Sequence, residues 1–151
     1  MVPSADFQDI VDNFELFDDW EDRYRYVIEL GRAMPPLPDE LKSAATKVDG
    51  CASQVWLVPE IRPGGESGRN GERNEDTLYF EGDSDAMIVR GLIAILRALY
   101  CGQPLCAVPQ IDAQRELGRL DLEQHLSSQR SNGLKAMVRR INDLARAGAP
   151  A

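Results

Sequence analysis

The sequence is poor in the residues that metal centres and disulfide frameworks require. Its 151 residues contain three cysteines and one histidine, and an odd cysteine count does not fit a secreted disulfide scaffold. Zinc and iron–sulfur sites usually draw four Cys or His ligands from tight spacings. Here four residues separate Cys101 from Cys106, whereas Cys51 and His125 lie on distant segments. A metal site is therefore a secondary hypothesis, and we expect His125 to be packed or hydrogen-bonded within the leucine-rich C-terminal segment.

Long apolar runs and phosphate-binding motifs are also missing. The longest apolar stretch, residues 91–96, lies between two arginines, whereas a membrane span needs about 20 apolar residues. The glycine-rich segment 64–68 lacks the Lys-Ser/Thr pair of a phosphate-binding loop. Residues 1–22 contain eight acids and no base, so no signal peptide is expected. These features favour a cytoplasmic protein that contacts neither membranes nor nucleotides.

The charge balance argues against nucleic acid as a partner. With 25 acidic and 17 basic residues the formal net charge is −8, which makes nucleic acid an unfavourable partner because its binding depends on Lys and Arg. The charge is uneven, since residues 126–151 carry five bases and only one acid, Asp143. Such segments are commonly solvated helix faces, and they also form two candidate docking surfaces for a protein partner, one acidic and one basic.

Hydrophobic periodicity predicts helices at both ends of the chain. The first predicted helix covers 7–14 and is capped by Ser4, and the second begins at 18 or 19 and is stopped by Gly31 and then residues 35–36. A third, short helix is predicted over 39–45. A long apolar helix begins at a Ser84 cap, has Asp85 in its first turn and ends near residue 100. An almost entirely apolar helix belongs in the centre of a core. Short helices over 117–126 and an amphipathic helix over 134–141 follow, with a frayed tail at 147–151.

Two strands are predicted between these groups of helices. Residues 54–58 and 77–80 are rich in β-branched and aromatic side chains. Residues 60–62 extend the first strand, and 63–75 form a polar, flexible hairpin loop. Helices, then a small antiparallel sheet, then helices indicate an α+β fold rather than alternating α/β units. We expect one domain over 1–151, and a monomer.

Cys51 is the most distinctive candidate for chemistry. Gly50 allows a sharp backbone turn before it, and the strand that follows would hold the loop rigid. A cysteine at such a tip can reach the sulfur of a partner protein. Two other interpretations have little support: no local pattern joins Cys51 to His125 as a hydrolase pair, and the acids around Ser84 look like helix caps.

Four segments, in order, are similar to the SufE family. Gly50-Cys51-Ala52-Ser53-Gln54-Val55-Trp56 resembles the Gly-Cys-x-Ser-Gln-Val-Trp signature of that family. The other blocks are 20–24 with 28–31, 82–86 with 88–94, and 125–134. The resemblance extends from about residue 5 to residue 146. The chain departs from the family pattern in its longer 63–75 loop. Cys101 and Cys106 match no motif of the family.

The resemblance implies a sulfur acceptor with the α+β fold of SufE and IscU, in which helices pack on a small antiparallel sheet. Proteins like SufE take persulfide sulfur from a pyridoxal-phosphate cysteine desulfurase of the SufS type, which they stimulate, and deliver it to the SufBCD scaffold for iron–sulfur cluster assembly. The related CsdE proteins use the desulfurase CsdA. By this match the chain is a persulfide carrier rather than a stand-alone enzyme and has no cofactor of its own. The implied acceptor is Cys51, and the supporting or partner-binding residues are Arg130, Asp85, Gly50, Ser53 and Gln54.

Thiol chemistry adds expectations about the surroundings of Cys51. Exchange requires a thiolate, whereas an ordinary cysteine is mostly protonated at neutral pH. Arg130 is the best candidate for a cation that lowers the cysteine pKa, because its block is expected to fold back near the Cys51 loop. Asp85 would instead hold the loop through backbone N–H groups. We expect apolar neighbours to shelter Cys51 until a partner docks.

Two functions of another class stay open at this stage. One is an IscU-like cluster scaffold or metal-binding protein that uses Cys51, Cys101 and Cys106. The other is an interaction module without cysteine chemistry.

Overall fold

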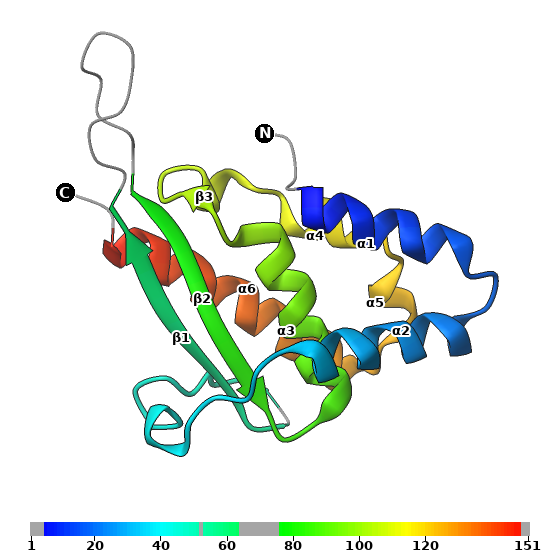
Figure 1. Ribbon diagram of the computed structural model, residues 1–151, viewed down its shortest axis with the longest axis horizontal. Coiled ribbons are helices and arrows are strands. Elements are labelled where there is room, and N and C mark those ends of the chain that lie inside the picture. Colours follow the sequence, from blue (N-terminus) through cyan, green and yellow to red (C-terminus); the bar gives the residue numbers. More distant parts are fainter. Residues whose placement is uncertain (1–4, 52, 64–75, 149–151) are drawn as a thin grey trace, which may run out of the picture.

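The structure is a computed structural model that describes residues 5–51, 53–63 and 76–148. The predictions for Ser4, for most of the 63–75 loop and for 149–151 lie outside these residues. The predicted order of helices, a strand hairpin and further helices is present, and a short third strand at Gln103–Pro104, which was not predicted, follows the long apolar helix (Figure 1). The elements are α1 (Ala5–Leu16), α2 (Trp20–Ala33), η1 (Asp39–Leu41), β1 (Val55–Arg62), β2 (Thr77–Ser84), α3 (Met87–Tyr100), β3 (Gln103–Pro104), η3 (Val108–Gln110), α4 (Ala113–Gly118), α5 (Leu122–His125) and α6 (Ser128–Gly148). The α+β prediction is confirmed.

A three-stranded antiparallel sheet of order β1-β2-β3 lies on one side of the molecule. β1 and β2 pair along their whole length, from Val55 opposite Ser84 to Arg62 opposite Thr77. The first strand includes 60–62 as predicted, and the second runs four residues beyond the predicted 77–80. Leu57, Leu78 and Phe80 are fully buried, while their strand neighbours are more exposed. That alternation is typical of a sheet that packs helices on one face.

The helix α3 lies between the sheet and the α1–α2 pair (Figure 1). Most of its side chains are buried, as its apolar sequence predicts. The helix α6 extends to the far end of the hairpin, where a Cβ on Gly148 would come within 3.0 Å of the Ile61 side chain. Ala147 and Gly148 are thus helical, and the predicted tail at 147–151 begins too early. Within the described residues no helix is long and apolar enough to cross a membrane.

The helices α2 and α3 cross in close contact, and α2 ends later than the sequence predicts. Gly31 does not stop α2, which continues to Ala33. A Cβ on Gly31 would lie 2.7 Å from the backbone nitrogen of Gly91, and one on Gly91 would lie 2.1 Å from the Val27 carbonyl oxygen. Glycine is therefore required here because the two helix backbones touch, not because the chain turns.

Three other local predictions are wrong. The expected helix over 39–45 is only one 3₁₀ turn, because the Thr46 hydroxyl donates to the Leu41 carbonyl at 2.6 Å and forms a turn instead. Ser84 ends β2, and α3 begins later, at Met87, with Ala86 as its N-cap. Asp85 therefore precedes the helix rather than lying in its first turn. The strand pairing with β1 has overridden the weak strand propensity of this segment.

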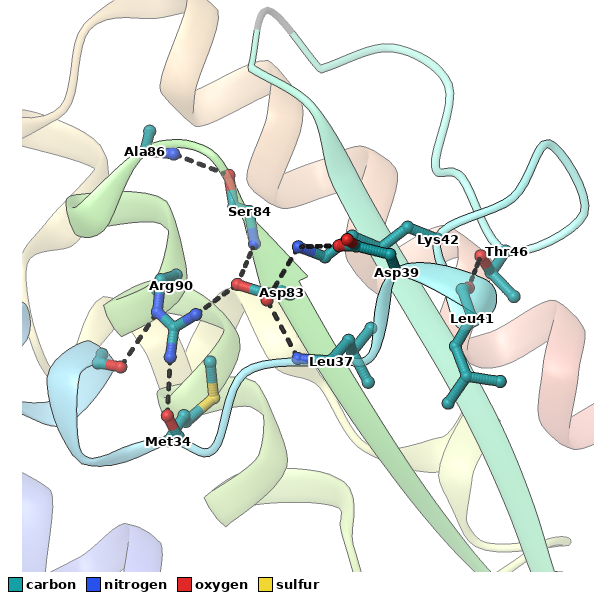
Figure 2. Close-up of polar contacts among 11 residues, drawn as sticks. Met34, Leu37, Asp39, Leu41, Lys42, Thr46, Asp83, Ser84, Ala86 and Arg90 are labelled. Carbon is teal, nitrogen blue, oxygen red and sulfur yellow. Dashed lines mark hydrogen bonds and ion pairs between the residues drawn. The ribbon is translucent and has the colours of Figure 1, made fainter.

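A buried ion pair fastens the segment between α2 and β1 to the sheet (Figure 2). The Asp83 carboxylate pairs with the Arg90 guanidinium and, at 3.5 Å, with the Lys42 ammonium. It also accepts the Leu37 backbone N–H at 3.0 Å. Arg90 in turn donates to the Met34 carbonyl at 2.6 Å. The acid that the sequence presented as a helix cap is thus the centre of a tertiary network.

Candidate functional site

Cys51 lies at the tip of a loop whose base is closed by strand pairing. The Val48 N–H donates to the Val55 carbonyl at 2.9 Å, and Lys47 pairs with Trp56 in an isolated antiparallel bridge. Between these closures the backbone turns at Gly50, which has a φ of +93°. Residues with a side chain rarely adopt that conformation, so the turn favours glycine. The predicted rigid loop after a glycine turn is therefore present around Cys51.

One stripe of α6 lies behind this loop. Gly133 packs directly on the cysteine, since a Cβ there would lie 3.5 Å from the Cys51 Sγ. A Cβ on Gly50 would come within 3.3 Å of the Ala136 Cβ, and Arg140 Nη2 donates to the Ala45 carbonyl at 2.7 Å. Positions 133, 136 and 140 share one helical face. This face of α6 therefore holds the whole segment that leads to Cys51.

Asp85 holds the other side of the loop. Its carboxylate Oδ1 accepts the Gln54 backbone N–H at 3.0 Å, and its own N–H donates to the Gln54 carbonyl at 3.3 Å. This is the backbone contact expected for Asp85. Gln54 itself is exposed, so its place in the site comes from its backbone rather than from a buried side chain.

A pocket of about 20 Å³ adjoins the cysteine. That space holds about one water-sized group. Its walls combine Cys51, Ser53 and Arg130 with apolar side chains from the sheet and from α3 and α6. The other lining residues are Val55, Val89, Leu92, Gln129, Gly133 and Met137. Arg130, at the start of α6, therefore lies beside the Cys51 loop, as the sequence interpretation requires.

The electrostatics of Cys51 differ from that interpretation. Burial raises the pKa of its thiol above the usual 9.0, and the negative charge of Asp49 raises it further. The thiol is half-buried and donates weakly to the Gly133 carbonyl, with an S···O distance of 3.7 Å. Proximity to Arg130 therefore does not produce a low thiol pKa in this conformation. At neutral pH the resting residue is a protonated, poorly nucleophilic thiol.

His125 does not pack within the C-terminal segment as predicted. It is exposed, and its ring stacks on Trp20 of α2 with a centroid distance of 3.7 Å. The Tyr24 hydroxyl donates to the His125 carbonyl, which adds a second contact between α2 and α5. The imidazole therefore stabilises a helix contact.

The two remaining cysteines occupy different surroundings. Cys101 is partly buried at the end of α3, where its thiol donates to the Phe80 carbonyl at 3.7 Å, and Cys106 is exposed. Burial raises the pKa of the Cys101 thiol, against the opposing effects of the Phe80 hydrogen bond and of Arg97. In the part of the chain that the structure describes, no three Cys, His, Asp or Glu side chains form a group that could hold a metal ion.

Sequence reasoning overlooked two residues that shape this site. Gly133 lies inside a helix, where glycine costs about 1 kcal/mol of stability relative to alanine. A glycine at such a position indicates that another segment of the chain packs closely against the helix. Arg140 looked like one more solvated base of the C-terminal helix. Its contact with Ala45, 95 positions earlier in the chain, leaves no periodic signal in the sequence.

Comparison with known proteins gives consistent sequence matches over nearly the whole chain. The family model described as SufE, an Fe-S metabolism associated domain, matches residues 8–145. An uncharacterized SufE-like protein of Rhizobium etli is 48% identical over 147 residues, covering 97% of this chain and 94% of the relative. A second uncharacterized SufE-like protein, from Rhizobium meliloti, is 47% identical over 142 residues, covering 94% and 96%.

A solved structure supports the fold alone. The solution structure of a hypothetical protein from Thermus thermophilus aligns with a TM-score of 0.69 at 21% identity, covering 97% of each chain. Sequence identity at that level does not carry function. It shows that the arrangement of helices on a small sheet recurs over nearly the full length of both chains.

Proposed function

The chain belongs to the SufE family, and on that premise we propose that Cys51 is the residue that accepts sulfur from a cysteine desulfurase. Family membership supports a role in sulfur transfer for iron–sulfur clusters. The observation that carries the finer proposal is the position of Cys51. It is a half-buried thiol at the tip of a fastened loop, beside a pocket of about 20 Å³ that Arg130 lines.

The chemistry is an exchange between a persulfide and a thiolate. The Cys51 thiolate attacks the outer sulfur of the desulfurase persulfide, so that one S–S bond forms on Cys51. The S–S bond on the desulfurase breaks, and its cysteine leaves as a thiolate. Electrons balance without an oxidant. Pyridoxal phosphate belongs to the desulfurase and takes no part in this step.

The resting structure protects the thiol until that encounter. Burial and Asp49 keep the Cys51 pKa high, so few molecules carry the attacking thiolate at neutral pH. Docking would draw the loop tip away from α6 and expose Cys51, which removes the burial that keeps the pKa of its thiol high. The pocket offers space for about one water-sized group, which the added sulfur can occupy once the loop returns.

The chain thus acts as a carrier that draws sulfur from the desulfurase, which speeds its turnover, and passes it on. The recipient in this proposal is a SufBCD scaffold. A desulfurase of the SufS or CsdA type fits the acceptor chemistry.

The test is the intact mass of the protein after incubation with a cysteine desulfurase, pyridoxal phosphate and cysteine, without reductant. Wild type is expected to gain one sulfur atom that a reducing agent removes. Cys51→Ser is expected to gain none, whereas Cys101→Ser and Cys106→Ser, the matched controls, are expected to behave as wild type. Sulfur uptake by Cys51→Ser, or none by wild type, would overturn the proposal.

A further inference from the structure

The pocket beside Cys51 has an apolar interior and a polar side. The apolar side chains of its lining come from β1, α3 and α6, and they also belong to the hydrophobic core of the protein. They are Val55, Val89, Leu92 and Met137, each at most 6% exposed. The polar side chains of the lining, Ser53, Gln129 and Arg130, are at least partly exposed. The pocket therefore joins a core-like interior to the protein surface.

The volume of the pocket decides how many sulfur atoms it can hold. It is about 20 Å³, whereas one water-sized group needs about 10–15 Å³ and two such groups need about 20–30 Å³. Sulfur is larger than the oxygen of water. One added sulfur atom therefore fits beside Cys51, and a second does not.

The walls of the pocket resist a longer chain of sulfur atoms. Protein cores are close-packed and compress little, and four of the lining side chains are part of the core. Forcing one extra group into such a core disfavours that state by about 5- to 150-fold. If Cys51 carried two added sulfur atoms, either its loop would stay open or its terminal sulfur would lie outside the pocket. Thiols and oxidants in solution would then reach that sulfur.

Shelter of the terminal sulfur also prevents a second transfer. As a perthiolate, this sulfur can attack the outer sulfur of another persulfide on the desulfurase. One S–S bond forms on the chain that Cys51 carries, the S–S bond on the desulfurase breaks, and the desulfurase cysteine leaves as a thiolate. The attack requires access to the nucleophile. A sulfur atom enclosed by the apolar side chains of the pocket has no such access.

From these observations we propose that the pocket limits Cys51 to one added sulfur atom, so that the protein carries a persulfide and not a longer polysulfide. Val89 and the other apolar side chains of the lining set this limit. The inference rests on the proposed function, because it concerns the sulfur that Cys51 accepts. Each docking event with the desulfurase then transfers one atom of sulfur.

The test counts the sulfur atoms on Cys51 by intact mass. The background carries Cys101→Ser and Cys106→Ser, so that Cys51 is the only thiol of the chain. Val89→Ala removes two methyl groups from the pocket lining, and Val11→Ala makes the same change at a buried position of α1 outside the pocket. The sulfur donor is either the desulfurase with pyridoxal phosphate and excess cysteine, or inorganic polysulfide alone. The polysulfide arm excludes the alternative that the desulfurase itself blocks a second transfer.

The readout is the ratio of the species with two added sulfur atoms to the species with one. With the intact pocket this ratio should be at most about one-fifth, the lower bound for overpacking a core. Val89→Ala should raise the ratio at least about fivefold, whereas Val11→Ala should leave it unchanged. The denatured chain in polysulfide is the positive control and should carry longer sulfur chains. An unchanged ratio in folded Val89→Ala would show that the pocket does not set the limit.

Failure of the limit and failure of the proposed function give different results. Two or more sulfur atoms on most molecules with the intact pocket overturn the limit alone, because Cys51 still accepts sulfur, and this result does not depend on whether Val89→Ala folds. Sulfur from polysulfide but none from the desulfurase overturns the proposed function, and the polysulfide arm still measures the limit. No sulfur on Cys51 from either donor overturns both.

Discussion

The buried Asp83 network permits a prediction of stability whose size follows from the structure. Replacing Asp83 by Asn removes the negative charge but keeps the size of the side chain. Asp83 is 2% exposed, and the side chain of its partner Arg90 is 12% exposed. Removing one member of a buried ion pair costs about 3–5 kcal/mol, because the remaining charge stays buried. Arg90 retains hydrogen bonds to the Gly31 and Met34 carbonyls, so we expect the lower end, about 3 kcal/mol.

The assay is thermal unfolding followed by circular dichroism. In a chain of this length 1 kcal/mol shifts the Tm by about 2–4 °C, so Asp83→Asn should lower the Tm by about 6–12 °C. Asp39→Asn is the matched control, because Asp39 pairs with the same Lys42 at 3.8 Å but is fully exposed. A surface pair of this kind is worth less than about 1 kcal/mol. The control Tm should therefore stay within a few degrees of wild type.

The pH dependence of this difference has a definite sign. Burial alone would raise the pKa of the Asp83 carboxyl, but the hydrogen bonds from the Leu37 and Ser84 N–H groups and the charges of Arg90 and Lys42 outweigh it and lower the pKa. The stabilisation is therefore complete above the unfolded pKa of about 3.9 and is lost as the pH falls through the lower folded-state value. The Tm gap between wild type and Asp83→Asn should be constant from neutral pH to about pH 5 and narrow in stronger acid. A gap below about 2 °C at neutral pH, less than the shift for 1 kcal/mol, or one that does not narrow, would refute this reasoning.

Four further outcomes are expected around the Cys51 loop. Asp85→Ala removes the acceptor for the Gln54 N–H and should speed Cys51 alkylation about fivefold, the equivalent of one hydrogen bond of about 1 kcal/mol; unchanged alkylation and unchanged amide exchange in the loop would exclude this role. Gly133→Ala should raise the Tm, since alanine favours a helix by about 1 kcal/mol, yet slow sulfur uptake, because its methyl group contacts the Sγ at 3.5 Å and takes space from the small pocket that Gly133 lines; faster uptake would contradict this. Arg140→Ala, which frees the Ala45 carbonyl, should speed alkylation of Cys51 severalfold in the free protein, unlike the same change at an exposed arginine of α6. The alkylation rate of free wild type should still rise above pH 9, because the Cys51 pKa is raised above the usual 9.0. Bound desulfurase should increase the alkylation rate at neutral pH. Equal rates with and without the desulfurase would show that docking does not expose the thiol.

The sequence predicted those parts of the fold whose side chains repeat with a regular period. The apolar length of α3 and the strand pattern of β1 are local properties; β1 and the end of α3 were placed correctly, although α3 begins later than predicted. The segment Gly82-Asp83-Ser84 was misassigned, because Asp and Ser before an apolar helix are typical of a cap. Its actual role depends on Leu37, 46 positions away, and no local pattern reports a contact at that separation.

The residues of the candidate site were predictable from the sequence, but their electrostatics were not. Family motifs and loop chemistry indicated Cys51, Arg130 and Asp85. In the fold, Arg130 lines the pocket beside Cys51, and Asp85 bonds to Gln54 at the base of the Cys51 loop. The state of the thiol was not predictable, because it depends on how deeply Cys51 sits against α6. Sequence reasoning expected a nearby cation to dominate, whereas burial and Asp49 do.

That difference bears on how a carrier of sulfur can be both stable and reactive. A permanently ionised, exposed Cys51 would exchange with any disulfide or oxidant it met, whereas a protonated thiol held against Gly133 reacts slowly. The contacts that hold the loop tip are individually weak: two hydrogen bonds between Asp85 and Gln54, the hydrogen bond from Arg140 to Ala45, the packing of Gly50 on Ala136, and the weak thiol contact with α6. Together they are small compared with the binding free energy of a protein partner of micromolar affinity, about 8 kcal/mol. Under the proposed function, a desulfurase that docks at the Cys51 loop therefore has ample free energy to open it, and reactivity can depend on the presence of the correct partner.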